Sequence, residues 1–284
     1  MFSYRHAFHA GNHADVLKHA VFVQLLRHLA KKDKPFCCID THCGPAVHDL
    51  DGAYALKNAE FKSGISRLWG RQALPPLLAD YLEQVRAANP AERLRYYPGS
   101  PQFATQLLRR KDSLRLFELH STESMAVQEH FRLTDARVQV KAVDGFVGLL
   151  SVLPPPSRRG LVLVDPSYED KDDYARVVTA LAEGLKRFAT GVYMVWFPQV
   201  QRREAARLPE ALARHCQAGQ LDWLHVTLTV KRPAVDGLGL HGSGLFLVNP
   251  PWTLPDMLKE AMPWLVQALG QDDGASYGLE YKIA

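Results

Sequence analysis

The feature that most constrains the fold of this chain is a repeated alternation of short apolar runs with longer helical stretches. Such alternation predicts strands that run mostly parallel in one sheet, with helices covering both faces. We therefore predict an α/β protein with a seven-stranded, mostly parallel sheet. The predicted strands are residues 36–40, 114–119, 138–143, 161–164, 192–197, 224–230 and 245–249.

An amphipathic helix is predicted ahead of the first strand, over residues 13–30. Apolar residues recur there every four positions, at Leu17, Val21 and Leu25, as expected for one helix face. Asn12 can cap the first turn, and Asp15, three residues later, can bond back to the cap and suits the positive end of the helix dipole.

The connection between the first two strands is too long for a single crossover helix. About 70 residues separate them, so we predict a small helical insertion at residues 48–97. Pro75 and Pro76 can open one helix, and Ser100 with Pro101 can form the N-cap and first residue of the next. The expected organisation is an N-terminal motif, helix and first strand at 1–47, the insertion at 48–97, and the remaining core at 98–284.

The composition is that of a compact protein, with 47% hydrophobic and 23% charged residues. No apolar run approaches the roughly 18 residues that cross a bilayer, so we expect a cytoplasmic protein without membrane contact. The four cysteines include no CxxC pair and are expected to be reduced thiols. Residues 1–35 hold six Lys or Arg against two Asp, which accounts for the whole net charge of +4 and predicts a local basic face.

Polar or acidic residues stand at four consecutive predicted strand ends. In open α/β sheets, ligands bind beyond the carboxyl ends of the strands, near the point where strand order reverses. These residues therefore mark a candidate binding site. They are Asp40-Thr41-His42-Cys43-Gly44-Pro45, Glu118-Leu119-His120, Val143-Asp144-Gly145 and Asp165-Pro166-Ser167-Tyr168.

Two of these residues suit a nucleoside ligand. A carboxylate after the second strand, here Glu118, can accept hydrogen bonds from both ribose hydroxyls. A glycine after the first strand, here Gly44, lets the backbone approach a ligand closely. The chain has neither GxGxxG nor GxxxxGK[ST], so the sequence disfavours NAD, FAD and P-loop nucleotide chemistry.

The fourth strand end resembles a motif of known enzymes. Asp165-Pro166-Ser167-Tyr168 is similar to the [Asp/Asn]-Pro-Pro-[Tyr/Phe/Trp] motif of S-adenosylmethionine-dependent amino-methyltransferases. Further segments, spread over nearly the whole chain, resemble the bacterial 23S ribosomal RNA adenine-N6 methyltransferase family called RlmJ. These segments are YRHAFHAGNHADVLKH (4–19), YYPGSP (96–101), SRRG (157–160), KRFATG (186–191) and NPPW (249–252).

The resemblance implies a Rossmann-like class I methyltransferase that transfers methyl from S-adenosyl-L-methionine to N6 of one adenine in 23S ribosomal RNA. S-adenosyl-L-homocysteine is then the product, and no metal is needed. We expect a monomer without an obligate protein partner, whose insertion and basic N-terminus contact RNA phosphates. The implied cofactor-binding residues are Lys18, His19, His42, Ser100, Glu118, Asp144, Gly145 and Asp165. The implied catalytic residues are Asp165, Pro166 and Tyr168, and the substrate-binding residues are Tyr4, His6, Lys18 and Tyr168.

The chemistry of the amine explains the implied catalytic residues. The lone pair of an adenine amine is delocalised into the ring, so the nitrogen must become pyramidal before it attacks a methyl group. The Asp165 carboxylate and the Pro166 carbonyl can each accept one N–H and stabilise the positive charge that develops. The Tyr168 ring can stack on a base that has been turned out of its helix.

The chain departs from the family pattern at two positions. Pro45 follows Gly44 where relatives tend to have Gly-Ala-Gly, which removes one N–H near the cofactor. Ser167 replaces the second proline of the catalytic motif, which loosens a turn but keeps the Asp165 carboxylate and the Pro166 carbonyl.

Asn249-Pro250-Pro251-Trp252 matches the amine motif more closely than the stretch at 165–168 does. In the seven-stranded arrangement that the resemblance implies, however, the last strand is antiparallel and its end points away from the cofactor. We therefore predict that this segment is a rigid strand-exit turn.

Three alternative functions are compatible with the sequence. The same residues can methylate N6 of adenine in DNA, and the departures at Pro45 and Ser167 allow a catalytically silent RNA-binding protein on the same fold. A metal-dependent hydrolase is a distant third, based on the seven histidines within the first 48 residues. His9 and His13 have the spacing of a zinc-binding pair, but Gly11 and Asn12 between them disfavour a continuous helix.

Overall fold

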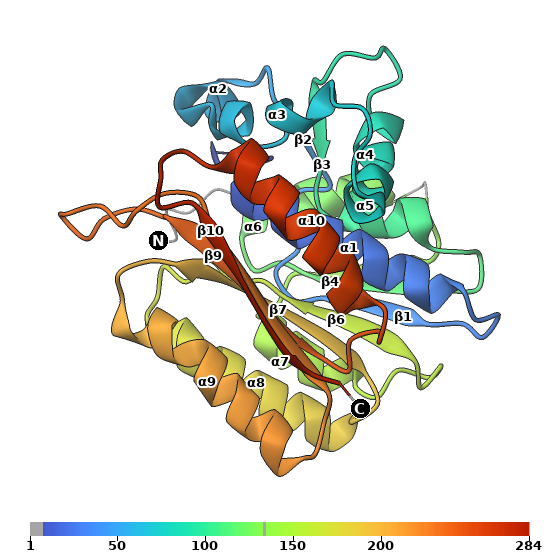
Figure 1. The fold of residues 1–284 in the computed structure, drawn as a ribbon. Coiled ribbons are helices and arrows are strands. Elements are labelled where there is room, and N and C mark those ends of the chain that lie inside the picture. Colours follow the sequence, from blue (N-terminus) through green and yellow to red (C-terminus); the bar gives the residue numbers. More distant parts are fainter. Residues whose placement is uncertain (1–7, 133–134, 284) are drawn as a thin grey trace.

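The central feature of the protein is one twisted sheet with helices on both faces (Figure 1). It is seen in a computed structural model, which describes residues 8–132 and 135–283. Within these residues the main sheet has eight strands, in the order β10-β8-β9-β7-β6-β1-β4-β5. Their bounds are β1 Cys37–Asp40, β4 Ser113–Phe117, β5 Val138–Lys141, β6 Gly160–Val164, β7 Val192–Gln199, β8 Trp223–Thr229, β9 Gly242–Val248 and β10 Ser276–Lys282.

The strand order reverses beside β1. From β1 the chain moves to β4 and β5 on one side, and later to β6 and β7 on the other, with parallel pairing throughout. Strand β9 then inserts between β7 and β8 and is antiparallel to both. The carboxyl ends of β1, β4 and β6 therefore meet at one edge of the sheet, where a ligand crevice is expected.

All seven predicted strands are confirmed, as is the α/β Rossmann-like class, but the sheet has one more strand than predicted. Strand β10 pairs antiparallel with β8 at the edge of the sheet. Its sequence, SYGLEYK, lacks an apolar run because six of its seven residues are exposed to solvent. An exposed edge strand leaves little hydrophobic signal in a sequence.

The helices divide between the two faces of the sheet. One face packs against α1, α5, α6 and α10, and the other against α7, α8 and α9, so each face has its own apolar core. Within the described residues, no helix has the length and apolar character needed to span a membrane. The helix bounds are α1 His13–Ala30, α5 Ser100–Leu107, α6 Ser121–Phe131, α7 Gly145–Val152, α8 Asp172–Arg187, α9 Arg203–Ala218 and α10 Leu254–Leu269.

Helix α1 begins and ends where the sequence predicts, but it is far more buried than an ordinary amphipathic helix. Fifteen of its eighteen residues are buried, because the sheet, α4 and α5 enclose it. The Asn12 side chain caps the helix by accepting the backbone N–H groups of Ala14 and Asp15. The Asp15 carboxylate accepts the N–H of Gly11 instead of the predicted N–H of Asn12, so the capping box is displaced by one residue.

The segment between β1 and β4 contains a pair of short strands with several helices between them, which lie above α1 in Figure 1. Its two strands pair antiparallel and bring the ends of the segment together. Pro75 is the N-cap of α4, so this helix begins at Pro76 as predicted. The bounds are β2 Val47–Asp49, α2 Ala53–Asn58, the 3-10 helix η2 Glu60–Ser63, α3 Ser66–Trp69, α4 Pro76–Ala87 and β3 Tyr96–Pro98.

The predicted N-cap of the next helix is wrong by one residue. Gly99 is the cap of α5, and Ser100 is already the first helical residue. The Ser100 hydroxyl does not bond to the end of its own helix but donates to the Asp40 carboxylate. The Ser100 hydroxyl therefore bonds to Asp40, which is distant in sequence, and does not form the local capping bond.

Gly148 allows α7 to pack closely on β4, and this contact gives a stability prediction. A Cβ at Gly148 would lie 2.3 Å from Cδ1 of Phe117, whose ring is buried and cannot move aside. We expect Gly148→Ala to lower the free energy of unfolding by about 1–3 kcal/mol, measured by chemical denaturation, because overpacking outweighs the helix propensity of alanine. Gly70→Ala is the control, since a Cβ there meets nothing within 4 Å; equal effects of both substitutions would contradict the packing argument.

Candidate active site

The carboxyl ends of β1, β4 and β6 open onto a cavity of about 620 Å³, which we call the strand-end cavity. The N-terminal half of α1 forms one wall, and the loops after the strands form the others. The structure brings together here every described residue that was predicted to bind the cofactor. These are Lys18, His19, His42, Ser100, Glu118, Asp144, Gly145 and Asp165.

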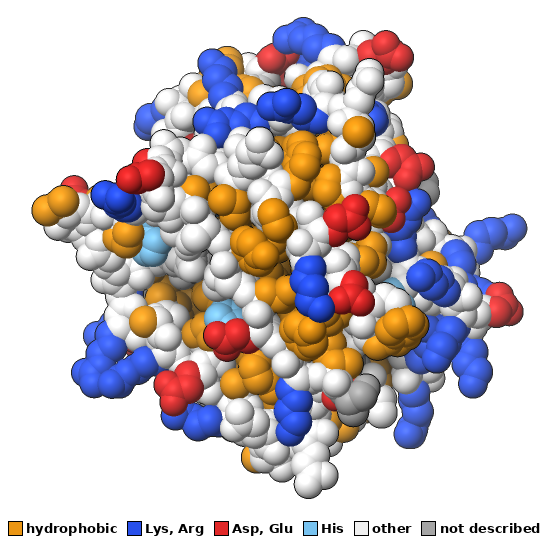
Figure 2. Space-filling model, in the orientation of Figure 1, with side chains coloured by type: hydrophobic (Ala, Val, Ile, Leu, Met, Phe, Trp, Pro, Cys, Tyr) orange, Lys and Arg blue, Asp and Glu red, His pale blue; other side chains and the backbone are white. Residues whose placement is uncertain are grey.

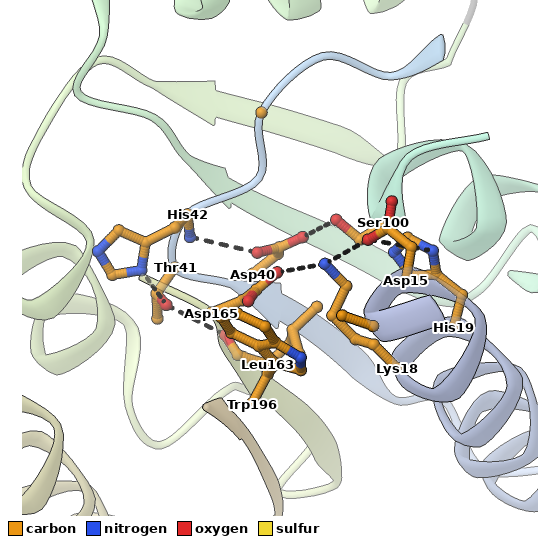
Figure 3. A network of polar contacts seen from close by, with 12 residues as sticks. Asp15, Lys18, His19, Asp40, Thr41, His42, Ser100, Leu163, Asp165 and Trp196 are labelled. Atoms are coloured by element: carbon orange, nitrogen blue, oxygen red, sulfur yellow. Dashed lines mark hydrogen bonds and ion pairs between the residues drawn. The ribbon is translucent and has the colours of Figure 1, made fainter. Parts of the chain in front are cut away.

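A buried ammonium group links two sides of the cavity (Figure 3). The Nζ atom of Lys18 lies 2.6 Å from Oδ2 of Asp165 and 2.9 Å from Oδ1 of Asp15. Burial lowers the pKa of Lys18, but the two carboxylates outweigh burial and raise it above its usual value. Lys18 is therefore a cation, and it ties the first turns of α1 to the loop after β6.

A second buried carboxyl group stands beside this ion pair, on Asp40 at the end of β1. It accepts hydrogen bonds from the Ser100 hydroxyl at 2.6 Å and from the backbone N–H of His42 at 3.2 Å. Burial raises the pKa of Asp40 to about 7, and the nearby Asp165 charge acts in the same direction. The sequence placed Asp40 at a strand end but gave it no role, because its burial and its neighbours are tertiary features.

His42 is neutral in this environment. Desolvation lowers the pKa of His42 to about 4. Its Nδ1 atom lies 2.7 Å from the hydroxyl of Thr41, which in turn donates to the carbonyl of Leu163 at the end of β6. The imidazole edge packs on the Phe146 ring, with a centroid distance of 4.9 Å. The ring is thus held in one orientation at the cavity wall.

Backbone N–H groups position two further carboxylates at the cavity, on Glu118 and Asp144. Glu118 accepts the N–H of Gly44 at 2.9 Å and the N–H of His120 at 2.7 Å. Asp144 caps α7 by accepting the N–H groups of Phe146 and Val147. Partial burial raises the pKa of Asp144, but its bond to Arg176 and these N–H groups lower it overall.

Gly145 is required where α7 meets the loop after β1. A Cβ at this position would lie 1.7 Å from the carbonyl oxygen of Thr41. No side chain fits there, so the start of α7 lies directly against the end of β1. This close approach of Gly145 to Thr41 was not predicted, and it shapes one wall of the strand-end cavity.

His19 connects the cavity to the segment between β1 and β4. Its Nδ1 atom lies 2.8 Å from the Tyr97 hydroxyl, and that hydroxyl lies 3.0 Å from the hydroxyl of Tyr81. The His19 ring also packs against Phe103, with 4.8 Å between the ring centroids. This buried chain holds α1, β3 and α4 together behind the cavity.

The structure separates the members of the Asp165-Pro166-Ser167-Tyr168 motif. The first three line the cavity, but Tyr168 is not among the described lining residues. Its ring is buried against Tyr174, and its hydroxyl donates to the carbonyl of Trp196. Stacking of Tyr168 on a base would require the ring to leave these contacts. Trp196 lines the cavity instead, and sequence analysis had not singled it out.

Other predicted features lie elsewhere. Tyr4 and His6 are outside the described residues. The segment at 249–252 follows the antiparallel β9 and contributes to the cavity none of its described residues, and the Asn249 amide bonds to the carbonyls of Ala189 and Gly191. Among the residues that the structure describes, no three His, Cys, Asp or Glu side chains converge as a metal site would require.

Comparison with known proteins matches nearly the whole chain to one family. The family model described as "Ribosomal RNA large subunit methyltransferase D, RlmJ" matches residues 33–282. The "Ribosomal RNA large subunit methyltransferase J" of Escherichia coli strain K12 is 45% identical over 265 residues, which is 93% of each chain. The protein of the same name from Haemophilus influenzae is 43% identical over 282 residues, or 99% of each chain.

A solved structure has the same overall fold as this chain. The crystal structure of protein LPL1258 from Legionella pneumophila strain Philadelphia 1 superposes on this chain with a TM-score of 0.86. The two sequences are 35% identical, and the match covers 96% of this chain and 98% of the other. The fold of the strand-end cavity is therefore shared with a protein of very similar length and architecture.

The raised pKa of Asp40 predicts a pH-dependent stability. The folded protein keeps the Asp40 proton up to about pH 7, whereas the unfolded chain releases it near pH 4. The folded state thus binds more protons between these values, so the group's stabilising contribution is lost as pH rises through about 7.

Asp40→Asn removes this titration while retaining an acceptor for the His42 N–H and a donor for Ser100. As the pH rises from 5 to 8, we expect the wild type to lose on the order of 2 kcal/mol of unfolding free energy that Asp40→Asn does not lose. Urea denaturation at both pH values measures the difference. Parallel pH profiles for the two proteins would exclude Asp40 as the titrating group.

Proposed function

The chain belongs to the RlmJ family of ribosomal RNA large subunit methyltransferases, and we propose that it transfers a methyl group from S-adenosylmethionine to the exocyclic N6 amine of one adenine in 23S ribosomal RNA. The observation that carries this proposal is the position of Asp165. Its carboxylate faces the strand-end cavity at the end of β6, oriented by a buried cation and followed directly by Pro166.

The cavity fits the proposed methyl donor in size and in charge. Its volume of about 620 Å³ is within the range of about 300–1,000 Å³ that is usual for small-molecule sites. Glu118 lies at the end of β4, where a carboxylate can accept hydrogen bonds from the hydroxyl groups of a ribose. Asp144 and Asp165 suit the cationic groups of the donor. At Gly44, which also lines the cavity, a Cβ would meet nothing within 4 Å, so a ligand can lie close to the backbone there.

The bound donor supplies an activated methyl group on a positively charged sulfur. In our proposal the Asp165 carboxylate and the Pro166 carbonyl accept the two N–H groups of the adenine amine. These bonds draw the hydrogens out of the base plane and orient the nitrogen lone pair toward the methyl carbon. A carbon–nitrogen bond forms as the sulfur–carbon bond breaks, and the amine then loses its extra proton.

The ion pair between Lys18 and Asp165 prepares this step. A carboxylate on a flexible loop would have to be oriented at the moment of reaction, at a cost in rate. The Lys18 ammonium, held on the other side by Asp15, fixes the carboxylate beforehand. Preorganised charge of this kind stabilises a transition state without further rearrangement.

We place the reaction in the cytoplasm, on a monomeric enzyme, as the sequence predicts. Adenine in DNA presents the same amine to Asp165, so the polymer must be identified by its product. Digestion of RNA and of DNA after reaction, followed by nucleoside mass spectrometry, decides between them. N6-methyladenosine from 23S ribosomal RNA supports the proposal, and the deoxynucleoside from DNA overturns it.

Removal of the Asp165 carboxylate tests the catalytic assignment. We expect Asp165→Ala and Asp165→Asn to lower the methylation rate by about two orders of magnitude or more, because one preorganised polar group typically contributes this much. Nucleoside mass spectrometry of treated RNA measures the rate. Asp256→Asn, on the outer face of α10, is the matched control and should keep the wild-type rate. Full activity in the Asp165 variants would show that the Asp165 carboxylate is not needed for methyl transfer.

A further inference from the structure

We propose that the loop between β8 and β9, residues 230–241, carries an apolar wedge formed by Val235 and Leu238, which enters the base stack of the RNA beside the target adenine. This inference rests on the proposed function, because it assigns to the same site the means by which the base is extracted. It concerns a surface that takes no part in the methyl transfer itself.

The first observation is the exposure of these two side chains. Val235 is fully exposed to solvent and Leu238 is 73% exposed, although both are apolar. Figure 1 shows the loop projecting from the body of the protein beyond the end of β9, and Figure 2 shows hydrophobic side chains at its outer end. Two exposed apolar side chains, three positions apart on a projecting loop, point to a surface that becomes covered in a complex.

The second observation is the location of the loop at the rim of the strand-end cavity. Lys231, Gly239 and Leu240, at the two ends of the loop, line the cavity. Val235 and Leu238 lie between these positions in the chain, on the part that extends outward. In our proposal, the nucleic acid that delivers a base to Asp165 enters the cavity past this part of the rim. The Lys231 ammonium at the base of the loop suits a phosphate of the same strand.

The third observation is that the loop has a defined conformation. The carbonyl of Ala234 accepts the N–H of Gly237 and so closes a turn with Val235 at its apex. The carboxylate of Asp236 accepts the N–H of Leu238, and the Gln201 side chain donates to the Ala234 carbonyl from the neighbouring loop. Gly237 and Gly239 adopt φ values of 75° and 85°, which glycine tolerates best. The backbone that carries the two apolar side chains thus has a defined turn conformation before RNA binds.

A wedge is useful here because the proposed catalytic groups lie below the protein surface. The side chains of Lys18 and Asp165 are only 4% and 13% exposed, so a base that stays stacked in its helix cannot reach them. Extraction of a base costs a few kcal/mol of stacking and pairing. An apolar side chain that fills the vacated space recovers part of this cost, because it leaves water as it enters the stack.

The test compares two RNA hairpins that contain the adenine methylated by the intact protein. In one the target base is fully stacked, and in the other its neighbour is an abasic nucleotide, so that the gap already exists. We expect the double substitution Val235→Ser with Leu238→Ser to lower the methylation rate about tenfold on the stacked hairpin and less than twofold on the abasic one. Equal losses on both hairpins, or no loss on either, would overturn the wedge.

Trp252→Ser is the matched control. Trp252 is 75% exposed on the segment that follows the opposite end of β9, so its removal deletes a comparable apolar surface away from the cavity. We expect the control to keep wild-type rates on both hairpins. A loss in the control equal to that in the double variant would show a general effect of surface polarity and contradict the proposal.

A binding measurement separates failure of this inference from failure of the proposed function. With 2-aminopurine in place of the target adenine, extraction of the base raises its fluorescence without any methyl transfer. We expect the intact protein and Trp252→Ser to produce this rise and the double variant to lose most of it. A fluorescence rise that depends on Val235 and Leu238, without methylation of either hairpin, would refute the proposed function alone. Methylation of the hairpins, with identical fluorescence in all three proteins, would refute the wedge alone.

Discussion

The structure around the cavity depends on one buried ion pair. An ammonium group such as that of Lys18 is costly to bury unless carboxylates surround it, and Asp15 and Asp165 meet this need from two different elements. The same interaction joins the start of α1 to the end of β6. It therefore closes one wall of the strand-end cavity and orients the proposed catalytic carboxylate. Removal of the Lys18 ammonium would take away the counter-charge that Asp15 and Asp165 share in the interior.

Other buried polar groups around the cavity are also held by partners from distant parts of the chain. Asp40 is held by Ser100 and by the backbone of His42, and its raised pKa reflects its burial close to Asp165. His19 is linked through Tyr97 to Tyr81, so the helices between β1 and β4 support the cavity from behind. The cavity is thus made by α1, the strand ends and this segment together. The β8–β9 loop adds a projecting apolar edge at its rim, which we propose acts on the base stack of RNA.

Much of the architecture was predictable because it depends on local patterns. Apolar runs revealed the seven core strands, and a four-residue period revealed α1 with Asn12 as its cap. The exposed strand β10 was missed because an edge strand that faces water carries no apolar run. The cap of α5 was misplaced because the Ser100 hydroxyl binds Asp40 across the fold. The stacking role predicted for Tyr168 assumed a ring in the cavity, whereas the structure packs that ring against Tyr174.

The residue types at the strand ends and the resemblance were enough to indicate the family and the edge of the sheet where the cavity lies, since the position of the carboxyl edge follows from the connectivity of an α/β sheet. Burial, pairing and orientation came only with the folded chain. The bond from Lys18 to Asp165 spans 147 positions in sequence, and the raised pKa of Asp40 comes from its burial and from the charge of Asp165 on another strand end. The exposure of Val235 and Leu238 likewise depends on what the rest of the protein leaves uncovered. Electrostatics and solvent exposure are properties of distances in space, which no local pattern encodes.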